Sequence, residues 1–247
     1  MIINHLYGII GFPLTHSFSP TYFNQKFSDL NLLDHYFETF EIPQIEYLNN
    51  IIQSHPNLRG LSVTVPHKQS VIPFLDHIDS VALEVGAVNS IKVSNGKMHG
   101  FNTDAYAFEI SLYDLINEHL PLKALVLGNG GASRAVQYVL RKLEIEFQVV
   151  SRTKRDDTIM YEEVDHEMVN NHDLIINTTT LGMFPKNHYK PYFPYHALNK
   201  NHLLFDLIYN PNETLFLYEG RKKGCKTKNG LDMLQLQSEK SWEIWNA

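Results

Sequence analysis

"ALVLGNGGASRA", residues Ala124 to Ala135, is the stretch that indicates the fold. Apolar residues typical of a buried strand lead into a glycine-rich turn at Gly128–Gly131, and a helix is expected to begin near Ala132. Glycines permit a tight turn and a close backbone approach, so that a pyrophosphate can bind at the positive N-terminus of the helix. The pattern favours a dinucleotide-binding domain. Ser133 stands in place of the third glycine of the usual fingerprint, and a merely tight turn is the alternative.

The next expected strand, residues 147–152, indicates which dinucleotide is bound. About 20 residues beyond the first glycine, an NAD-binding chain presents Asp or Glu to the ribose 2′-hydroxyl. This chain has Ser151-Arg152-Thr153-Lys154-Arg155 there, without a carboxylate. Because a planar guanidinium group suits a phosphate monoester and hydroxyl groups can complete its cradle, the cluster favours NADP. The alternative is a solvated basic loop.

Apolar periodicity predicts strands alternating with helices along the whole chain. In the first part, the predicted strands are 5–10, 36–42 and 60–65, the predicted helices are 20–30, 45–53 and 69–78, and a hairpin joins 87–93 to 97–102. Its turn, Asn95-Gly96, is the dipeptide that a type I′ turn favours. A long helix at 103–119 serves as a connector, followed by strands 123–128, 147–152, 173–179 and 203–209 and by helices 132–143, 213–222 and 233–245. This alternation predicts parallel sheets covered by helices on both faces.

Composition and charge argue against several classes of function. A formal net charge of −6 over 247 residues excludes a general binder of nucleic acid or anionic membranes, which needs a dominant basic face. Cys225 is the only cysteine and the 13 histidines lack a metal-ligand spacing, so neither a disulfide nor a metal site is expected. The sequence shows no signal peptide and no window apolar enough to span a membrane, so we expect a cytoplasmic protein.

A lysine follows the third predicted strand at "SVTVPHK", residues Ser62 to Lys68. The β-branched residues favour a sheet, Pro66 prevents its continuation, and Lys68 comes two residues later. Since ligands of open α/β sheets bind beyond the carboxyl ends of strands, we expect Lys68 and Asp104 to face a cleft between two domains. There the lysine can hold or donate a proton as a carbonyl is reduced, while the carboxylate positions and tunes it. The alternative for each is an ordinary surface charge, and for Asp104 also a helix cap.

Hydroxyl groups follow the first predicted strand in "GFPLTHSFSP", which contains Ser17 and Ser19. Pro20 turns this loop into a helix start, so an N-cap is the alternative role for Ser19. Both hydroxyls are expected on the same side of the sheet as Thr64, Lys68 and Asn89. Such a set suits a polyhydroxy or carboxylate substrate with many hydrogen bonds to satisfy.

Eight segments in this order resemble the shikimate dehydrogenase family, and the likeness runs through almost the whole chain. They are YGIIGFPLTHSFSP (7–20), VTVPHK (63–68), GAVNS (86–90), NTD (102–104), GNGGASR (128–134), SRT (151–153), NTTTLGM (177–183) and NGLDMLQLQ (229–237). We know of no other family that combines the HSxSP, VTVPxK and NTD elements. Many relatives have Asn where Ser62 and Ser151 stand, and Gly where Ala105 stands.

The resemblance implies NADPH-dependent, reversible reduction of 3-dehydroshikimate to shikimate in aromatic amino-acid biosynthesis. It carries over Lys68 and Asp104 as the catalytic pair. The substrate ligands that it implies are Ser17, Ser19, Thr64, Asn89, Gln237 and, less directly, Tyr209. The NADP-binding residues that it implies are Gly128, Asn129, Gly130, Gly131, Ala132, Ser133, Arg134, Ser151, Arg152, Thr153, Arg155 and Gly230.

The implied architecture is a two-domain α/β protein. Residues 1–102 form the substrate-binding and catalytic domain, with the C-terminal helix at about 231–247 packing back on it, and residues 103–230 form a Rossmann-like NADP-binding domain. We expect a small-molecule substrate and a monomer or homodimer. Three alternatives remain: a dehydrogenase that also accepts quinate or NAD, a different reductase with the same layout such as a folate-type dehydrogenase, and a non-catalytic NADP-binding regulator.

Overall fold

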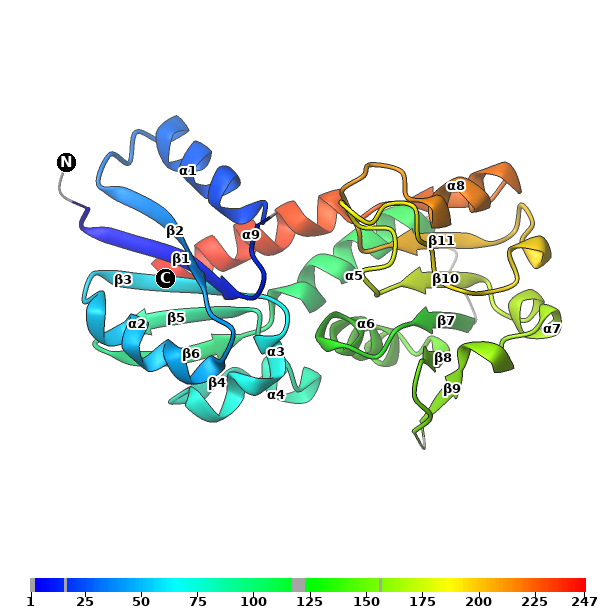
Figure 1. Cartoon of the computed structure of the whole chain (residues 1–247), viewed down its shortest axis with the longest axis horizontal. Helices are drawn as coiled ribbons and strands as arrows, with labels where there is room; N and C mark the ends of the chain where they lie inside the picture. Colours follow the sequence, from blue (N-terminus) through cyan, green and yellow to red (C-terminus); the bar gives the residue numbers. More distant parts are fainter. Residues whose placement is uncertain (1–2, 16, 117–122, 156) are drawn as a thin grey trace. The chain divides into compact units, whose positions relative to one another are not determined.

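The protein divides into two compact units, each built around one sheet (Figure 1). The computed structural model describes residues 3–15, 17–116, 123–155 and 157–247. The first unit comprises Met1–Thr103 and Ser238–Ala247, and the second comprises Asp104–Gln237. The boundaries fall after the first residue of helix α5 (Thr103–Ile116) and inside helix α9 (Leu231–Asn246), so each of these helices contributes residues to both units.

The first unit contains a six-stranded mixed sheet with the strand order β2-β1-β3-β5-β6-β4. The strands are β1 (His5–Gly11), β2 (His35–Glu41), β3 (Leu58–Val63), β4 (His77–Ile78), β5 (Ser90–Ser94) and β6 (Lys97–Phe101). The helices of this unit are α1 (Ser19–Asp29), α2 (Leu48–Ser54), α3 (His67–Ser70) and α4 (Ser80–Val85), together with two short 3-10 turns. Only β5 runs antiparallel to its neighbours, because the predicted hairpin reverses the chain at Asn95 and Gly96, whose φ angles of 52° and 73° suit a type I′ turn.

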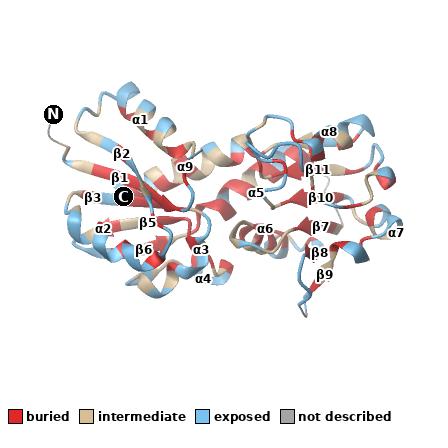
Figure 2. Cartoon of the chain, in the orientation of Figure 1, coloured by how far each residue is buried: buried red, intermediate tan, exposed pale blue. Residues whose placement is uncertain are grey.

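Apolar side chains cover both faces of this sheet, because successive strand residues point to opposite sides. Leu6 of β1 belongs to a buried cluster that includes Leu48 of α2. Its neighbour Tyr7 belongs to an aromatic cluster with Phe23 of α1 and Trp245 of α9. Figure 2 shows the buried residues gathered along the strands and along the inner sides of these helices. The C-terminal part of α9 is therefore a component of the core of the first unit.

The second unit contains a parallel sheet with the strand order of a Rossmann fold. Its strands are β7 (Lys123–Leu127), β8 (Glu146–Ser151), β9 (Thr158–Met160), β10 (Leu174–Asn177), β11 (Leu203–Asp206) and β12 (Lys226–Lys228). Read from β9, the order is β9-β8-β7-β10-β11-β12. When the strands of this unit are numbered in chain order, this is the order 3-2-1-4-5-6 of the Rossmann fold. The helices are α6 (Gly131–Lys142), α7 (His166–Asn170) and α8 (Leu215–Lys222), with two further 3-10 turns. The expected α/β class and Rossmann arrangement are confirmed.

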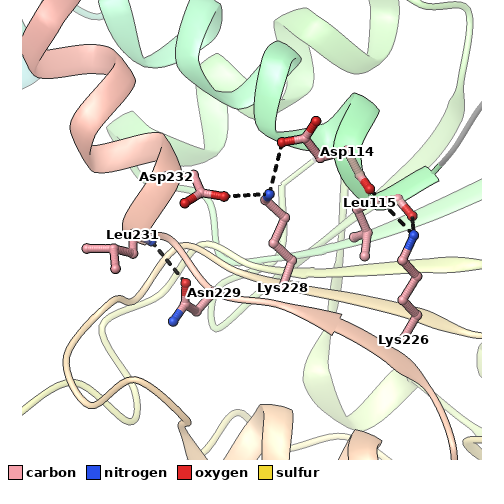
Figure 3. A network of polar contacts seen from close by, with 7 residues as sticks. All are labelled: Asp114, Leu115, Lys226, Lys228, Asn229, Leu231 and Asp232. Atoms are coloured by element: carbon pink, nitrogen blue, oxygen red, sulfur yellow. Dashed lines mark hydrogen bonds and ion pairs between the residues drawn. The ribbon is translucent and has the colours of Figure 1, made fainter.

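Polar contacts join the end of α5, strand β12 and the start of α9 (Figure 3). The Nζ of Lys226 donates hydrogen bonds to the backbone carbonyls of Leu115 (2.5 Å) and Asp114 (3.5 Å), which lie in the last turn of α5. Carbonyls at a helix C-terminus lack intrahelical partners, so this lysine caps the helix. Lys228 pairs with the carboxylates of Asp114 (3.2 Å) and Asp232 (2.7 Å), and its side chain is only 15% exposed.

One predicted helix is wrong, and several short elements were missed. Residues 69–78 do not form a single helix: α3 ends at Ser70, a 3-10 turn follows at Ile72–Phe74, and His77–Ile78 pairs with β6. Pro73 explains the break, because a proline inside a helix removes a hydrogen bond and collides with the preceding turn. Strands β4, β9 and β12 and helices α4 and α7 were not predicted. The last residues of the predicted helix 103–119 lie outside the described residues.

Within the described ranges, no helix has both the length and the hydrophobicity that crossing a membrane requires.

Asp206, at the C-terminal end of β11, is a buried carboxylate that connects three segments of the second unit. It accepts hydrogen bonds from Thr214 Oγ1 (2.5 Å), Asn177 Nδ2 (3.0 Å) and the backbone N–H of Ile208 (3.0 Å). Burial raises the pKa of Asp206 to about 7, and these three hydrogen bonds act in the opposite direction. The carboxyl group therefore holds a proton at pH values where an exposed aspartate has lost it.

Asp206→Asn is expected to remove a decline in stability that the wild-type protein shows between about pH 4 and pH 7. In the unfolded chain this carboxyl titrates near 3.8, so in that interval the folded protein holds a proton that the unfolded chain has released. Since one pKa unit corresponds to about 1.4 kcal/mol, the decline is expected to be on the order of 4 kcal/mol in the free energy of unfolding. Urea unfolding of both proteins at several pH values across the interval measures it.

Asp157→Asn is a matched control, because it makes the same substitution at an exposed position outside this network. The asparagine at position 206 keeps an oxygen that can accept from Asn177 and Ile208, so the variant is expected to fold. Parallel pH profiles for wild type and Asp206→Asn would contradict the assignment of the decline to this carboxyl group.

Candidate active site

Four of the segments singled out from the sequence leave the first sheet at one edge. Strands β1 and β3 run parallel with Ile10 beside Val63, so the loops that follow them emerge together. Strand β5 runs antiparallel to β3 with Ser90 opposite Ser62, so the residues before β5 lie at this same edge. Phe101, at the end of β6, pairs with Ser90 and brings the start of α5 there as well.

The loop after β1 carries Ser17 and Ser19 and lies against the loop after β3. The backbone N–H of Phe12 donates to the carbonyl of Val65 (3.0 Å). A Cβ on Gly11 would collide with the Thr64 side chain, so the glycine allows the two loops to approach. Ser19 is buried and is the first residue of α1, whereas the N-cap position is Phe18, which makes no side-chain cap hydrogen bond. The alternative role of Ser19 as the N-cap is therefore wrong.

Lys68 lies in the short helix α3, and hydrogen bonds fix its backbone. Strand β3 ends at Val63, and the N–H of His67 closes a turn onto the carbonyl of Thr64 (2.9 Å). The imidazole of His67 is buried and its Nε2 donates to the carbonyl of Ile42 (2.7 Å). The carbonyl of Lys68 accepts from the N–H of Val88 (2.7 Å). The base of the lysine side chain is thus held between β2 and the Gly86–Ser90 loop.

The start of α5 is tied to the same Gly86–Ser90 loop by two asparagines. Asn89 accepts from the backbone N–H of Thr103 through Oδ1 (2.7 Å) and donates through Nδ2 to Thr103 Oγ1 (2.9 Å). Asn102 donates to the carbonyl of Ala87 (2.8 Å). Asp104 follows as the second residue of α5 and is only 6% exposed. A carboxylate in the first turn of a helix is favoured by the helix dipole.

The glycine-rich turn lies at the carboxyl edge of the second sheet, after β7. Gly128 has a φ of 108°, and a Cβ there would lie 2.7 Å from Thr178 Oγ1, so this position requires glycine. A Cβ on Gly130 would meet nothing within 4 Å, which leaves the open space that a phosphate group needs. Ser133 is buried and its Oγ donates to the carbonyl of Gly128 (2.7 Å), so the serine closes the turn by a hydrogen bond.

Arg134, in the first turn of α6, carries a buried unpaired group. Its Nε has no hydrogen-bond partner within the described part of the chain. A buried donor without a partner is costly, and a phosphate oxygen would satisfy it. The N-cap residue of α6, Gly130, provides no side-chain cap for the first N–H groups of the helix. Together these features fit a dinucleotide pyrophosphate.

The basic turn after β8 is organised by Thr158. Its Oγ1 accepts from the backbone N–H of Arg155 (2.9 Å), and its own N–H donates to the carbonyl of Arg155 (3.1 Å). Ser151 Oγ accepts from the N–H of Thr153 (3.3 Å). Lys154 pairs with Glu163 (2.9 Å), while the exposed Arg152 and Arg155 extend from the same turn. The two guanidinium groups are therefore available at the carboxyl end of β8, next to the glycine-rich turn after β7.

Three predicted residues lie on other parts of the second unit. The Gly230 N–H donates to the carbonyl of Ile208 (3.0 Å), and a Cβ on Gly230 would collide with the backbone of Leu207, so packing alone requires this glycine. Tyr209 is half-buried three residues beyond β11. Gln237 is half-buried in α9, where its Nε2 donates to the carbonyl of Leu234 (3.0 Å).

The structure groups the predicted residues by unit. Ser17, Ser19, Thr64, Lys68 and Asn89 lie around one edge of the first sheet, whereas Asp104, Tyr209, Gln237 and the residues predicted for NADP belong to the second unit. Sequence reasoning assigned no role to the buried polar residues Asn177, Asp206 and Ser241, of which Ser241 contacts Thr103 beside Asp104. Their signal in the sequence was weak, because a buried serine or aspartate resembles any other until its partner is known.

Comparisons with known proteins identify relatives along almost the whole chain. A family model described as the shikimate dehydrogenase substrate binding domain matches residues 9–91. A protein named shikimate dehydrogenase (NADP(+)) from Methanococcus aeolicus is 38% identical over 258 residues, which cover 98% of this chain and 92% of the relative. The crystal structure of shikimate dehydrogenase from Aquifex aeolicus has a TM-score of 0.85 at 36% identity, covering 98% of this chain and 92% of that one. The enzyme from Thermus thermophilus, solved in complex with NADP(H) and shikimate, has a TM-score of 0.84 at 32% identity, covering 98% and 93%.

Proposed function

Because the chain belongs to the shikimate dehydrogenase family, we propose that it catalyses the reversible, NADPH-dependent reduction of 3-dehydroshikimate to shikimate in aromatic amino-acid biosynthesis. The observation that supports Lys68 and Asp104 as the catalytic residues is that the Gly86–Ser90 loop forms hydrogen bonds beside both of them. This loop binds the backbone of Lys68 through Val88 and the residue before Asp104 through Asn89. One loop thus contacts the backbone of Lys68 and the residue before Asp104.

The proposed roles of the two units follow from the residues at their sheet edges. We assign substrate binding to the first unit, with residues 1–102 and the C-terminal helix at about 231–247, and NADP binding to residues 103–230. The pyrophosphate would bind at Gly128–Arg134, where the open space at Gly130 and the unpaired Arg134 Nε fit it. The 2′-phosphate would bind at Ser151–Thr153 and Arg155, and Gly230 completes the set. When bound, NADPH supplies the hydride.

Lys68 and Asp104 handle the proton in the proposed reaction. In the reducing direction, the Lys68 ammonium group donates a proton from Nζ to the substrate carbonyl oxygen as that oxygen becomes a hydroxyl. In the oxidising direction, the lysine takes this proton back. The Asp104 carboxylate positions the lysine and stabilises its charged form. The contact between the Lys68 ammonium group and the substrate oxygen strengthens as negative charge develops on that oxygen, so it acts on the transition state.

The remaining proposed substrate ligands bind and orient the ring. They are Ser17, Ser19, Thr64, Asn89, Tyr209 and Gln237. Hydroxyl, amide and phenol groups suit the hydroxyls and carboxylate of shikimate, because each can donate and accept hydrogen bonds. We further propose that the protein works in the cytoplasm, which its single cysteine supports, and that it is a monomer or homodimer.

Purified protein is expected to reduce NADP when shikimate is added, followed by the nicotinamide absorbance. With shikimate as substrate, kcat/KM should be at least about tenfold higher for NADP than for NAD, because charged hydrogen bonds to a phosphate each contribute roughly 1.5–3 kcal/mol. Quinate serves as the comparison substrate in the same assay. Comparable kcat/KM values for both acids would favour a quinate/shikimate dehydrogenase. Tight NADPH binding without turnover of either acid would refute the enzyme and favour a regulatory protein.

A further inference from the structure

A chain of buried polar groups links α9 to the start of α5 within the first unit. Thr103 Oγ1, which receives the hydrogen bond from Asn89 Nδ2, lies 3.2 Å from Ser241 Oγ. Asn89, Thr103 and Ser241 are all buried, with Ser241 fully so. In such surroundings a hydroxyl group that loses its partner is not compensated by water, so the chain is costly to break.

Ser241 is carried by a firmly anchored part of α9. Four residues further along, the indole ring of Trp245 packs against the ring of Tyr7, with the ring centroids 5.4 Å apart. Two residues earlier, Glu239 accepts hydrogen bonds from Tyr22 and from Lys26, whose Nζ lies 2.6 Å from its nearer carboxylate oxygen. Because α9 is held to β1 and α1 on both sides of Ser241, the position of this hydroxyl group is well constrained.

We propose that Ser241 is a positioning residue: through Thr103 it fixes the first turn of α5 against the Gly86–Ser90 loop, and so orients Asp104 and Asn89. The inference rests on the proposed function, which gives those two residues their roles. Asp104 directly follows Thr103, so any rotation of the first turn moves its carboxylate. Misplacing a catalytic group slows the chemical step more than it weakens the binding of a cofactor whose phosphates are held by other residues.

The experiment compares Ser241→Ala with Ser111→Ala. Both serines are fully buried, but the Oγ of Ser111, in the interior of α5, has no hydrogen-bond partner among the described residues, so its removal breaks no hydrogen bond. Ser241→Ala is expected to lower kcat for shikimate oxidation roughly tenfold, which corresponds to about 1.4 kcal/mol, with little change in the KM for NADP. Ser111→Ala is expected to retain the wild-type kcat.

Variants of Thr103 test whether the effect passes through its hydroxyl group. Thr103→Val removes the hydroxyl and is expected to lower kcat, whereas Thr103→Ser keeps it and should restore most of the rate. The double variant Ser241→Ala/Thr103→Val should be no slower than Thr103→Val alone, because both changes break one chain. Additive losses, or equal kcat values for Ser241→Ala and Ser111→Ala, would overturn the proposal.

Hydrogen exchange separates failure of this inference from failure of the proposed function. In an α-helix that begins at Thr103, the amides of Ala107 and Phe108 donate to the carbonyls of Thr103 and Asp104. Ser241→Ala is expected to speed exchange at these two amides at least about fivefold relative to wild type and to Ser111→Ala, as loosening of the first turn demands. If the wild-type protein fails to oxidise shikimate, the proposed function is refuted. The exchange rates still test whether Ser241 holds the first turn of α5. Unchanged exchange rates would overturn it.

Discussion

Lys68→Met is expected to lower kcat for shikimate oxidation by roughly a thousandfold, within the range of about 10²–10⁴ that a positioned acid–base group contributes. Methionine has a similar length and fills the same space, but it has no proton to exchange with the substrate hydroxyl. The backbone hydrogen bond from Val88 to residue 68 does not depend on the side chain, so the variant should fold. Steady-state kinetics with saturating NADP measures the loss.

The distribution of the loss between kcat and KM is the decisive feature. An interaction made mainly in the transition state lowers kcat and kcat/KM together. Ser17→Ala, which removes a proposed substrate hydrogen bond, should instead mostly raise the KM for shikimate. Lys97→Met is the matched control, because it removes a lysine of the same unit from an exposed hairpin turn. If Lys68→Met turned over shikimate at the rate of Lys97→Met, the catalytic assignment would be wrong.

The sequence was sufficient for the long elements of the fold, because each has a clear period or a diagnostic turn. Strand β7, the glycine turn and helix α6 were recognised from one run of residues, and the hairpin from Asn95-Gly96. Strands β4, β9 and β12 have only two or three residues, too few to display any period. They exist because a neighbouring strand offers hydrogen bonds, which is tertiary information. The false helix at 69–78 arose from apolar spacing that outweighed the breaking effect of Pro73.

The candidate site could be located from its motifs, but its supporting contacts could not. Lys68 and Asn89 were found because they follow or precede strands in recognisable segments. The Ser241–Thr103 contact joins residues 138 positions apart, and no local pattern indicates it. Ser133 illustrates a different limit: it departed from the glycine fingerprint, and only the structure shows that its hydroxyl closes the turn onto Gly128. Motifs therefore mark the residues near the ligands, whereas the geometry that orients them depends on packing.

The second prediction with a large expected effect concerns Arg152 and Arg155, in the turn after β8. Arg152→Ala/Arg155→Ala is expected to lower kcat/KM for NADP about a hundredfold or more, because charged hydrogen bonds to a phosphate each contribute roughly 1.5–3 kcal/mol. The same variant should change kcat/KM for NAD less than about threefold, because NAD lacks the 2′-phosphate.

The wild-type preference for NADP should weaken with salt, since both guanidinium groups are exposed and screened by ions. Steady-state kinetics with each cofactor, at low and high salt, measures all three effects.

Lys154 provides the matched control within the same turn. Its ammonium group pairs with Glu163 at 2.9 Å, and Glu163 also accepts from the backbone N–H of Met160 (2.7 Å), so this lysine is engaged in holding the turn. Lys154→Ala removes a positive charge from the turn as each arginine variant does, but it should reduce kcat/KM for NADP only a fewfold, as expected of an exposed ion pair. If the turn only attracted the cofactor by its positive charge, substitutions of Arg152, Lys154 and Arg155 would each lower kcat/KM equally, and they would lower it as much for NAD as for NADP. An equal loss of kcat/KM with NADP and NAD would therefore refute a specific contact between the guanidinium groups and the 2′-phosphate. The contact is supported only if the arginine variant loses kcat/KM for NADP but not for NAD, and Lys154→Ala loses little for either.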